Sequence, residues 1–328
     1  MADVAYASDT ARRFVAALAS HGTTAALVFG SHFMPATAAL FEAAALAGVR
    51  VASGLVVSDR FLPAALRQSV SDAYRDSVDL IRRFHRRGRL LYAVTPRFAL
   101  STSDAMLEMC QSLVREHEDV RITSHVNEHH DEMHQVRSQF PWARDYFAVY
   151  ERYGLAGSRS VLAHNVHPTA GEIQRLSATR TSIAHCPCSN ASLGGGIFPL
   201  RAHLDAGVHV ALGTDVGAGT GFGVMKEALH AYLLQRVASN GAALDAARML
   251  YLSTLAGAEA LGLADVAGSF CSGKSADFVH LKPAADSVLD LVLRHASNGE
   301  DALAALFTLG DAGIVRETRV AGDVVYRQ

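Results

Sequence analysis

Short apolar runs of strand length recur along this chain, and amphipathic segments of helix length separate them. The runs are apolar along most of their length, as expected for strands buried on both faces of a parallel sheet. Alternating strand and helix signals of this kind favour a parallel β/α architecture. There are seven such runs, at 24–31, 49–57, 90–95, 120–126, 160–166, 182–187 and 208–215.

A closed barrel of this architecture has eight strands. The chain instead opens with a segment that favours helix, D-T-A-R-R-F-V-A-A-L-A-S-H-G at 9–22, and no strand candidate precedes it. We therefore predict an α/β fold, a TIM-like (β/α) barrel over 1–263 whose first strand is missing from this sequence. Two exposed strand edges would then flank the gap, which is an aggregation hazard.

The sequence changes character after residue 263. The segment G-S-F-C-S-G-K-S-A-D-F-V-H-L at 268–281 predicts a turn followed by a strand, and T-R-V-A-G-D-V-V-Y-R at 318–327 predicts a hairpin that turns at 321–323. We expect a helix around 299–309 between them. Residues 264–328 are predicted to form the C-terminal part of a small β-sandwich-like domain.

Composition excludes several classes of partner. The 328 residues carry 30 Lys and Arg against 32 Asp and Glu, and this near balance gives no reason to expect a nucleic acid or a membrane surface as partner. The N-terminus lacks the basic start and apolar core of a signal peptide. Four cysteines in a chain of this length do not form a disulfide framework. We therefore expect a cytoplasmic protein.

Polar residues end several of the predicted strands. His125 ends R-I-T-S-H, His164 ends S-V-L-A-H and Asp215 ends H-V-A-L-G-T-D. The carboxyl ends of barrel strands form the active-site rim, so these side chains are expected to converge there. Imidazole and carboxylate groups suit zinc, which activates a bound water in catalytic sites. Glu128, three residues beyond His125, is placed to act as a proton shuttle.

Each of these residues also has an ordinary structural interpretation. A single histidine at a strand end is more often a hydrogen-bonded structural residue, and Asp215 alone could cap the next segment. Their occurrence together on successive strand ends favours the metal site. His185, which ends another strand, is predicted to lie behind the metal ligands, and His32 is predicted to be an ordinary surface or core residue.

Arg97 and Phe98, in T-P-R-F, follow the strand at 90–95 on the same rim. A guanidinium that donates hydrogen bonds, next to an aromatic ring that can stack, suits a planar heterocycle bearing oxygen. A structural arginine beside a core phenylalanine is the alternative. The glycines at 213–223 do not have the spacing of a dinucleotide loop, and we predict a mobile loop there.

Taken together, these motifs resemble the guanine deaminases of the amidohydrolase superfamily. S-H-V-N-E, V-L-A-H, H-C-P-C-S-N, G-T-D-V-G-A-G and T-P-R-F occur in that family's order, as does L-F-T-L-G-D near the C-terminus. The resemblance implies hydrolysis of guanine to xanthine and ammonia, with zinc as cofactor and a homodimer as the assembly. It implies zinc ligands at His125, His164 and Asp215, proton transfer by Glu128 and Asp215, and guanine binding by Arg97 and Phe98.

The sequence departs from that family in one respect. Its members carry a His-x-His pair at the end of the first barrel strand, and no such pair occurs here in a strand-end context. We therefore expect residues 1–328 on their own to have little deaminase activity. Two alternatives are a related amidohydrolase acting on another amino-substituted heterocycle and an inactive protein that binds purines or a partner subunit.

Overall fold

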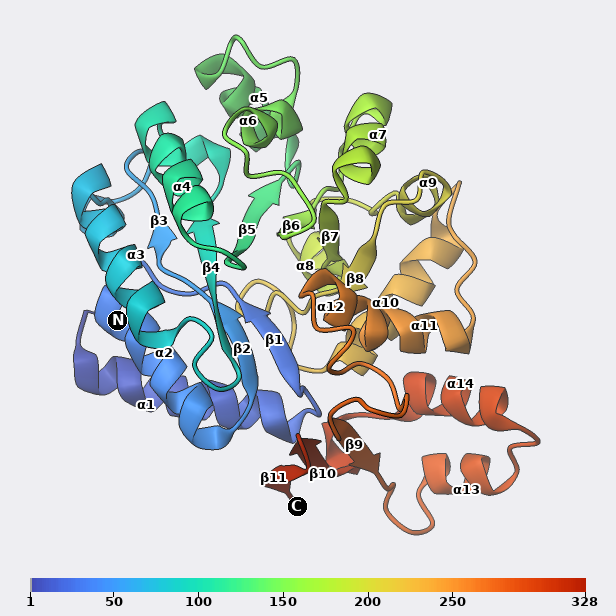
Figure 1. The fold of residues 1–328 in the computed structure, drawn as a ribbon. Helices are drawn as coiled ribbons and strands as arrows, with labels where there is room; N and C mark the ends of the chain where they lie inside the picture. The colour runs from blue at the N-terminus through green and yellow to red at the C-terminus, as the bar shows by residue number, and fades with distance from the viewer. Residues whose placement is uncertain (1) are drawn as a thin grey trace.

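A parallel sheet forms the centre of the computed structural model, which describes residues 2–328 (Figure 1). All of its strand pairings are parallel, and the order along the sheet is β1-β2-β4-β5-β6-β7-β8, with β3 paired to β4. The strands coincide with the seven predicted runs, and the second run is divided in two. They are β1 (Ala25–Val28), β2 (Arg50–Ser53), β3 (Val56–Val57), β4 (Leu90–Pro96), β5 (Arg121–Val126), β6 (Ser160–His164), β7 (Ser182–His185) and β8 (Val210–Leu212).

The division between β2 and β3 falls at Gly54. A Cβ atom on this residue would lie 1.7 Å from the carbonyl oxygen of Ala93 in β4. The backbones approach too closely for any side chain, so glycine is required and the strand breaks there. The apolar pattern at 49–57 gave no sign of this break, because the contact is made with a residue far along the chain.

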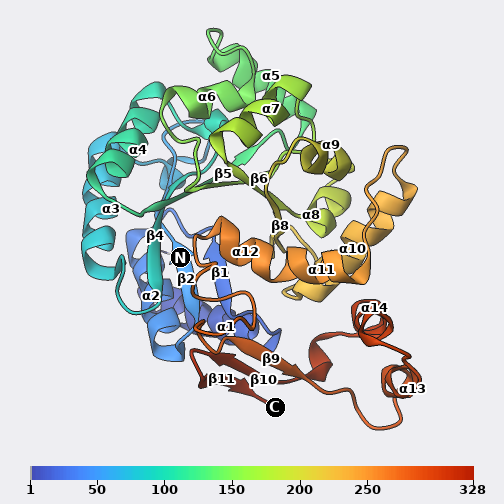
Figure 2. The ribbon, with the colours of Figure 1, turned by 45° about the vertical axis from the view of Figure 1, so that its right-hand side comes forward.

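Helices cover the outside of the sheet, which bends into an arc (Figure 2). Ser103 caps the helix that follows it, and Gly48 ends another in a left-handed conformation with φ 75°. The helices of this layer are α2 (Met34–Ala47), α3 (Val70–Phe84), α4 (Asp104–Glu116), α5 (His130–Gln139), α6 (Tyr146–Arg152), α7 (Ala170–Thr179), α8 (Pro187–Ser192), α9 (Leu200–Asp205), α10 (Val224–Val237), α11 (Ala246–Ser253) and α12 (Leu255–Ala260).

The arc is a half-barrel rather than a closed ring. Within residues 2–328, β1 pairs only with β2 and β8 only with β7. Helix α1 (Val4–Ser20) precedes β1, which confirms the predicted N-terminal helix. It packs against α2 and against the C-terminal strands, where Thr318 Oγ1 donates a hydrogen bond to the carbonyl of Ala19 (2.8 Å).

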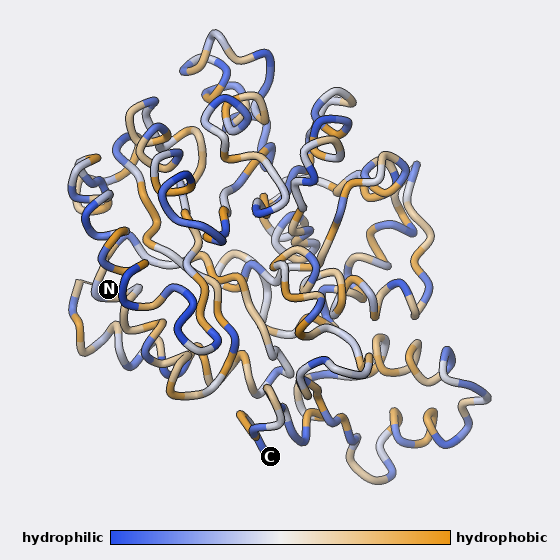
Figure 3. Tube along the Cα trace, viewed as in Figure 1, coloured by the Kyte–Doolittle hydropathy of each residue, from blue (hydrophilic) through white to orange (hydrophobic). Residues whose placement is uncertain are grey.

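A second, antiparallel sheet of three strands lies near the C-terminus, in the order β11-β10-β9. The predicted hairpin is confirmed: Ala321 and Gly322 turn it with φ of 52° and 82°. The predicted helix at 299–309 is also present, and it pairs with a second helix in an apolar helical hairpin (Figure 3). The elements are β9 (Phe278–Leu281), α13 (Val288–Arg294), α14 (Gly299–Leu309), β10 (Val315–Val320) and β11 (Asp323–Arg327).

The main hydrophobic core extends from the parallel sheet to the C-terminal part of the chain. Phe307 of α14 belongs to the same buried cluster as strand residues such as Val51 and Tyr92. A smaller cluster of Leu289, Ala305 and Ile314 lies under α13 and α14. The domain boundary at 263/264 remains a prediction.

A buried ion pair joins the sheets. Arg50 Nε lies 2.6 Å from Asp277 Oδ2, and the Asp277 side chain is 1% exposed. Burial acts to raise the pKa of Asp277, but hydrogen bonds from Arg50 and Ser275 outweigh it and lower the pKa below 3.8. Because the pKa is lower in the folded state, the pair stabilises the fold above pH 3.8 and this contribution is lost as the pH falls through the folded pKa.

We predict that Asp277→Ala lowers the free energy of unfolding at pH 7 by about 3–5 kcal/mol, since it leaves a buried guanidinium unpaired. Urea unfolding measures this, and the deficit should shrink as the pH falls below 3.8. Asp323→Ala is the matched control: Asp323 pairs with Arg89 but is 72% exposed, so we expect a loss below about 1 kcal/mol. Equal losses for the two variants would contradict the structural role given to Arg50 and Asp277.

Within the described residues, no helix combines the length and the apolar character needed to cross a membrane.

Candidate functional site at the carboxyl edge of the sheet

The ends of β5 and β6 bring three predicted site residues together. The rings of His125 and His164 stack with centroids 5.2 Å apart. Glu128 Oε1 lies 3.7 Å from His164 Nε2 and at the same distance from His129 Nε2. The Glu128 carboxyl group therefore lies next to the His164 ring at the edge of the sheet. Its role as a proton shuttle stays a prediction.

Both histidines have one ring nitrogen held by a hydrogen bond. His125 Nδ1 lies 2.8 Å from the carbonyl oxygen of Arg97, and His164 Nδ1 lies 2.9 Å from the side-chain oxygen of Asn190. These oxygens accept, so each Nδ1 carries a proton and each Nε2 is the ring nitrogen that a metal would take. This is the arrangement found around metal-binding histidines, whose second nitrogen donates to an oxygen.

Burial keeps His125 neutral. It lowers the pKa of the imidazole to about 3, with further lowering from His164 and the Arg97 guanidinium. A neutral imidazole is the form that binds a metal. His164 is also buried, at 1% exposed.

Asp215 follows β8. Its side chain is hydrogen-bonded by helix α8, which also bonds the His164 ring. Ser189 Oγ donates a hydrogen bond of 2.6 Å to Asp215 Oδ2, and the next residue, Asn190, accepts from His164. Two consecutive residues of α8 therefore orient a histidine of one strand end and a carboxylate of another. Ser189 and Asn190 were given no role from the sequence. Both lie a few residues after the end of a strand, in H-C-P-C-S-N, and that position is the signal that could have pointed to them.

The backbone at these strand ends is strained. His164 has φ 72° and Asp215 φ 46°, in the left-handed region that non-glycine residues rarely adopt. Asn127 and Asn165 also have positive φ, at 49° and 50°. Strain of about 1–3 kcal/mol per residue persists only where surrounding contacts enforce it, and such positions cluster at functional sites.

A buried polar network enforces that backbone. Asn127 Nδ2 donates to Asn165 Oδ1 (2.9 Å) and to Glu172 Oε1 (3.1 Å). Glu172 also accepts from the backbone amides of Phe147 and Thr169. The loops after β5 and β6 are thus fixed to each other, which holds Glu128 and His164 at a constant separation.

Arg97 and Phe98 lie beside this cluster, and their role in binding a substrate stays a prediction. The hydrogen bond from His125 to the Arg97 carbonyl joins the end of β5 to the loop after β4, and Phe98 forms an isolated bridge with His125. The Arg97 guanidinium lies 4.4 Å from the centroid of the Phe98 ring. The cation therefore stacks on its neighbouring ring, and its donors remain available at the edge of the sheet.

His185, at the end of β7, lies behind the site. It is buried, its ring stacks on Phe198 at 4.4 Å, and neither ring nitrogen has a hydrogen-bond partner among residues 2–328. Burial lowers its pKa to about 3, with further lowering from His203 and His164. The position agrees with the predicted place behind the ligands.

Cys186 lies beside the site as a buried thiol. Burial raises the pKa of its thiol well above the usual value, and the carboxylates of Asp215, Glu227 and Glu128 raise it further.

The donor set fits a zinc ion in its chemistry, with two imidazoles and one carboxylate, each oriented by an outer hydrogen bond. Across residues 2–328, however, no three His, Cys, Asp or Glu side chains lie close enough together to hold a metal ion. The rings of His125 and His164 are in contact. Asp215 is connected to His164 only through the hydrogen bonds that both make to α8.

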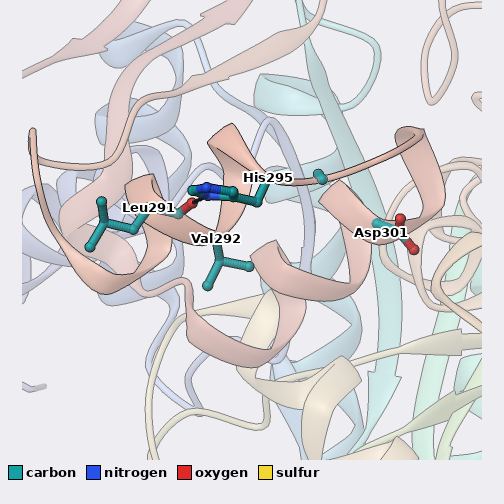
Figure 4. A pocket seen from close by; sticks show the side chains of 5 residues that line it. Leu291, Val292, His295 and Asp301 are labelled. Atoms are coloured by element: carbon teal, nitrogen blue, oxygen red, sulfur yellow. Dashed lines mark hydrogen bonds between the residues drawn. The ribbon is translucent and has the colours of Figure 1, made fainter.

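A shallow pocket lies elsewhere, between α13 and α14 (Figure 4). It is lined by Leu291, Val292, His295, Ala296 and Asp301. These residues are remote in sequence from the strand ends and include none of the predicted site residues, so the pocket is not part of the site.

Imidazole, carboxylate and guanidinium groups gathered at the carboxyl edge of a parallel β/α sheet define the site of a barrel-type hydrolase. Residues 2–325 match the amidohydrolase family. The chain belongs to that family.

Relatives within the family are similar over nearly the whole chain. A probable guanine deaminase of Deinococcus radiodurans is 55% identical over 327 residues, which cover 99% of this chain and 74% of that protein. The solved guanine deaminase of Escherichia coli is 40% identical with a TM-score of 0.97, and the match covers 100% of this chain and 76% of that one.

Two further solved structures contain ligands. A guanine deaminase from C. acetobutylicum with guanine in its active site has a TM-score of 0.92 at 25% identity, covering 99% of this chain and 77% of that one. An adenosine deaminase from Xanthomonas campestris with bound zinc has a TM-score of 0.84 at 27% identity, covering 98% and 70%.

Proposed function

We propose that this protein hydrolyses guanine to xanthine and ammonia at the carboxyl edge of its sheet. The observation that carries the proposal is the hydrogen bond from His125 to the Arg97 carbonyl, since it joins a heterocycle-binding pair to the histidine and carboxylate cluster. Similarity to guanine deaminases along nearly the whole chain supports guanine as the substrate, as does a relative with guanine bound.

Zinc is the proposed cofactor, held by His125, His164 and Asp215. When bound, it supplies Lewis acidity that lowers the pKa of water toward neutrality. The zinc-containing relative and the oriented Nε2 atoms support this assignment.

The side chains of this chain carry out the remaining steps. Arg97 donates to the guanine carbonyl oxygen while Phe98 packs on the ring. Asp215 accepts the proton of the attacking water, and Glu128 protonates a ring nitrogen as the water oxygen bonds to the carbon bearing the exocyclic amine. Asp215 then returns its proton to the amine as the carbon–nitrogen bond breaks, and the hydroxyl proton passes to Glu128. Ammonia leaves, the carbonyl of xanthine forms, and both carboxyl groups regain their starting protonation.

The rate expected of the 1–328 polypeptide is low. It offers three protein ligands at most, and those three side chains do not form a closed metal-binding group. We therefore expect only a fraction of the molecules to hold zinc, and only that fraction to hydrolyse guanine. The cytoplasmic location and the homodimer also stay predictions.

Ammonia release from a panel of substrates tests the proposed function. The zinc-supplemented protein should act on guanine at least about 100-fold faster than on adenine or an amino-triazine, since a site built to bond a carbonyl rejects analogues lacking it. Preference for another amino-heterocycle would favour the related-amidohydrolase alternative. Release from none of the substrates by a folded, zinc-loaded protein would favour the inactive alternative.

Arg97 should decide recognition of the carbonyl. We predict that Arg97→Leu weakens binding of xanthine by about 10–100-fold, the range expected for a lost hydrogen bond to a charged donor. Equilibrium dialysis with labelled xanthine measures this without turnover. Binding of 2-aminopurine, which lacks the carbonyl, is the matched control and should change little. Equal weakening of both ligands would show that Arg97 only supports the fold.

A further inference from the structure

His32 follows β1 and is tied to the loop after β3. Its Nε2 lies 3.1 Å from Ser58 Oγ, and its carbonyl accepts a hydrogen bond of 2.8 Å from Gln68 Nε2. Ser58 is fully buried, at 0% exposed. The half-buried imidazole is therefore held against the interior by its bond to Ser58.

The hydrogen bonds continue from Ser58 to the loop that carries Arg97 and Phe98. Ser58 Oγ lies 3.2 Å from Ser101 Oγ, which is also buried, and Ser101 Oγ lies 3.5 Å from the carbonyl oxygen of Phe98. A shorter bond of 2.9 Å from Thr102 Oγ1 reaches the same carbonyl. Three side chains in series thus connect the end of β1 to the Phe98 backbone.

The backbone follows the same route. The amide of Arg97 donates to the carbonyl of Val57 (3.1 Å), the residue directly before Ser58. The amide of Asp59, directly after Ser58, donates to the carbonyl of Ser101 (3.0 Å). Ser58 therefore lies between two backbone hydrogen bonds to this loop, and its side chain adds a third bond to it through Ser101.

The charges around His32 favour a neutral donor at this place. Burial lowers the pKa of its imidazole to about 4, and the nearby Arg97 guanidinium lowers it further. A cationic side chain here would repel Arg97. A neutral His32 ring bonded to Ser58 supports the loop that carries Arg97 and Phe98. It does not add a second cation that would attract the purine carbonyl away from Arg97.

We propose that His32 is a positioning residue that, through Ser58 and Ser101, holds Arg97 and Phe98 in the orientation that binds the carbonyl edge of the purine. This inference rests on the proposed function. It adds the segment after β1, which lies two strands away from β4 in the sheet, to the substrate-binding apparatus.

Xanthine binding by equilibrium dialysis tests the proposal in the 1–328 protein. His32→Phe removes the bond to Ser58 and should weaken xanthine binding about 10-fold, as expected for one hydrogen bond in a series. His32→Asn restores a donor and should bind within about 3-fold of the unchanged protein. His209→Phe is the matched control: this half-buried histidine bonds the Ala256 carbonyl at 2.8 Å, and its loss should leave xanthine affinity unchanged.

A double-variant cycle separates positioning from general support of the fold. In an Arg97→Leu background His32→Phe should have a smaller effect on xanthine affinity than in the unchanged protein, because only the positioning of Phe98 then remains to be lost. Equal weakening in both backgrounds would overturn the proposal, as would unchanged affinity in the single variant. Ser58→Ala repeats the test should His32→Phe fail to fold, with the same expected loss.

The two failures are distinguishable. If the unchanged protein does not bind xanthine in an Arg97-dependent manner, the proposed function fails and this inference with it. If it does, and His32→Phe and Ser58→Ala both bind equally well, only the role of His32 is overturned.

Discussion

Glu128→Gln is expected to lower kcat for guanine by about 10²–10⁴-fold, the contribution typical of a positioned proton-transfer group. The carboxylate faces His164 Nε2 at 3.7 Å and its side chain is only 16% exposed, so bulk water does not substitute for it. The amide keeps the shape and loses the transferable proton. KM should change little, because Glu128 acts on the ring nitrogen as the reaction proceeds.

Rates of xanthine formation measure this effect, with zinc content and melting temperature determined on the same samples. Asp131→Asn is the matched control, since Asp131 lies three residues further on, at the exposed start of α5. It should leave kcat unchanged. A Glu128→Gln protein that retains zinc and full activity would exclude Glu128 as the proton shuttle.

Asp215→Ala should have the second large effect, because the carboxylate has two proposed roles. Loss of a ligand should weaken zinc binding by at least about 100-fold, the upper end of what losing an outer hydrogen-bond partner costs. Loss of the proton acceptor should lower kcat by about 10³-fold even when zinc is supplied in excess. Competition with a chromophoric chelator gives the zinc affinity, and guanine turnover at saturating zinc gives kcat.

Two further variants serve as comparisons for Asp215→Ala, one with a smaller expected effect and one with none. Ser189→Ala removes only the hydrogen bond to Asp215 Oδ2 and should weaken zinc binding by about 10-fold. Asp205→Ala changes an exposed carboxylate of α9 and should have no effect on zinc or turnover. Undiminished zinc affinity in Asp215→Ala would remove Asp215 from the ligand set.

The elements that position the site could be predicted from sequence because their signals are local. Apolar runs that stop abruptly at His125, His164 or Asp215 mark both the strand and the side of the sheet on which it ends. The same holds for the hairpin at Ala321 and Gly322, where turn residues separate two alternating runs. These features depend on neighbouring residues, so the sequence alone is sufficient.

The contacts that orient the site could not be predicted in this way. Asn190 and Ser189 act on residues 26 positions away in each case, at His164 and Asp215. Gly54 breaks its strand because of a carbonyl in β4. His32, assigned to surface or core from the sequence, has no nearby partner along the chain, and its bond to Ser58 exists only once the strands are side by side. Such roles depend on the three-dimensional arrangement.

The most direct test of the central claim is the formation of xanthine from labelled guanine as a function of zinc bound per chain. We expect no xanthine without zinc, and a slow rate that rises in proportion to bound zinc and is lost in Glu128→Gln. Xanthine formation by the zinc-free protein, or none by a folded protein with zinc fully bound, would contradict zinc-dependent hydrolysis of guanine at this site.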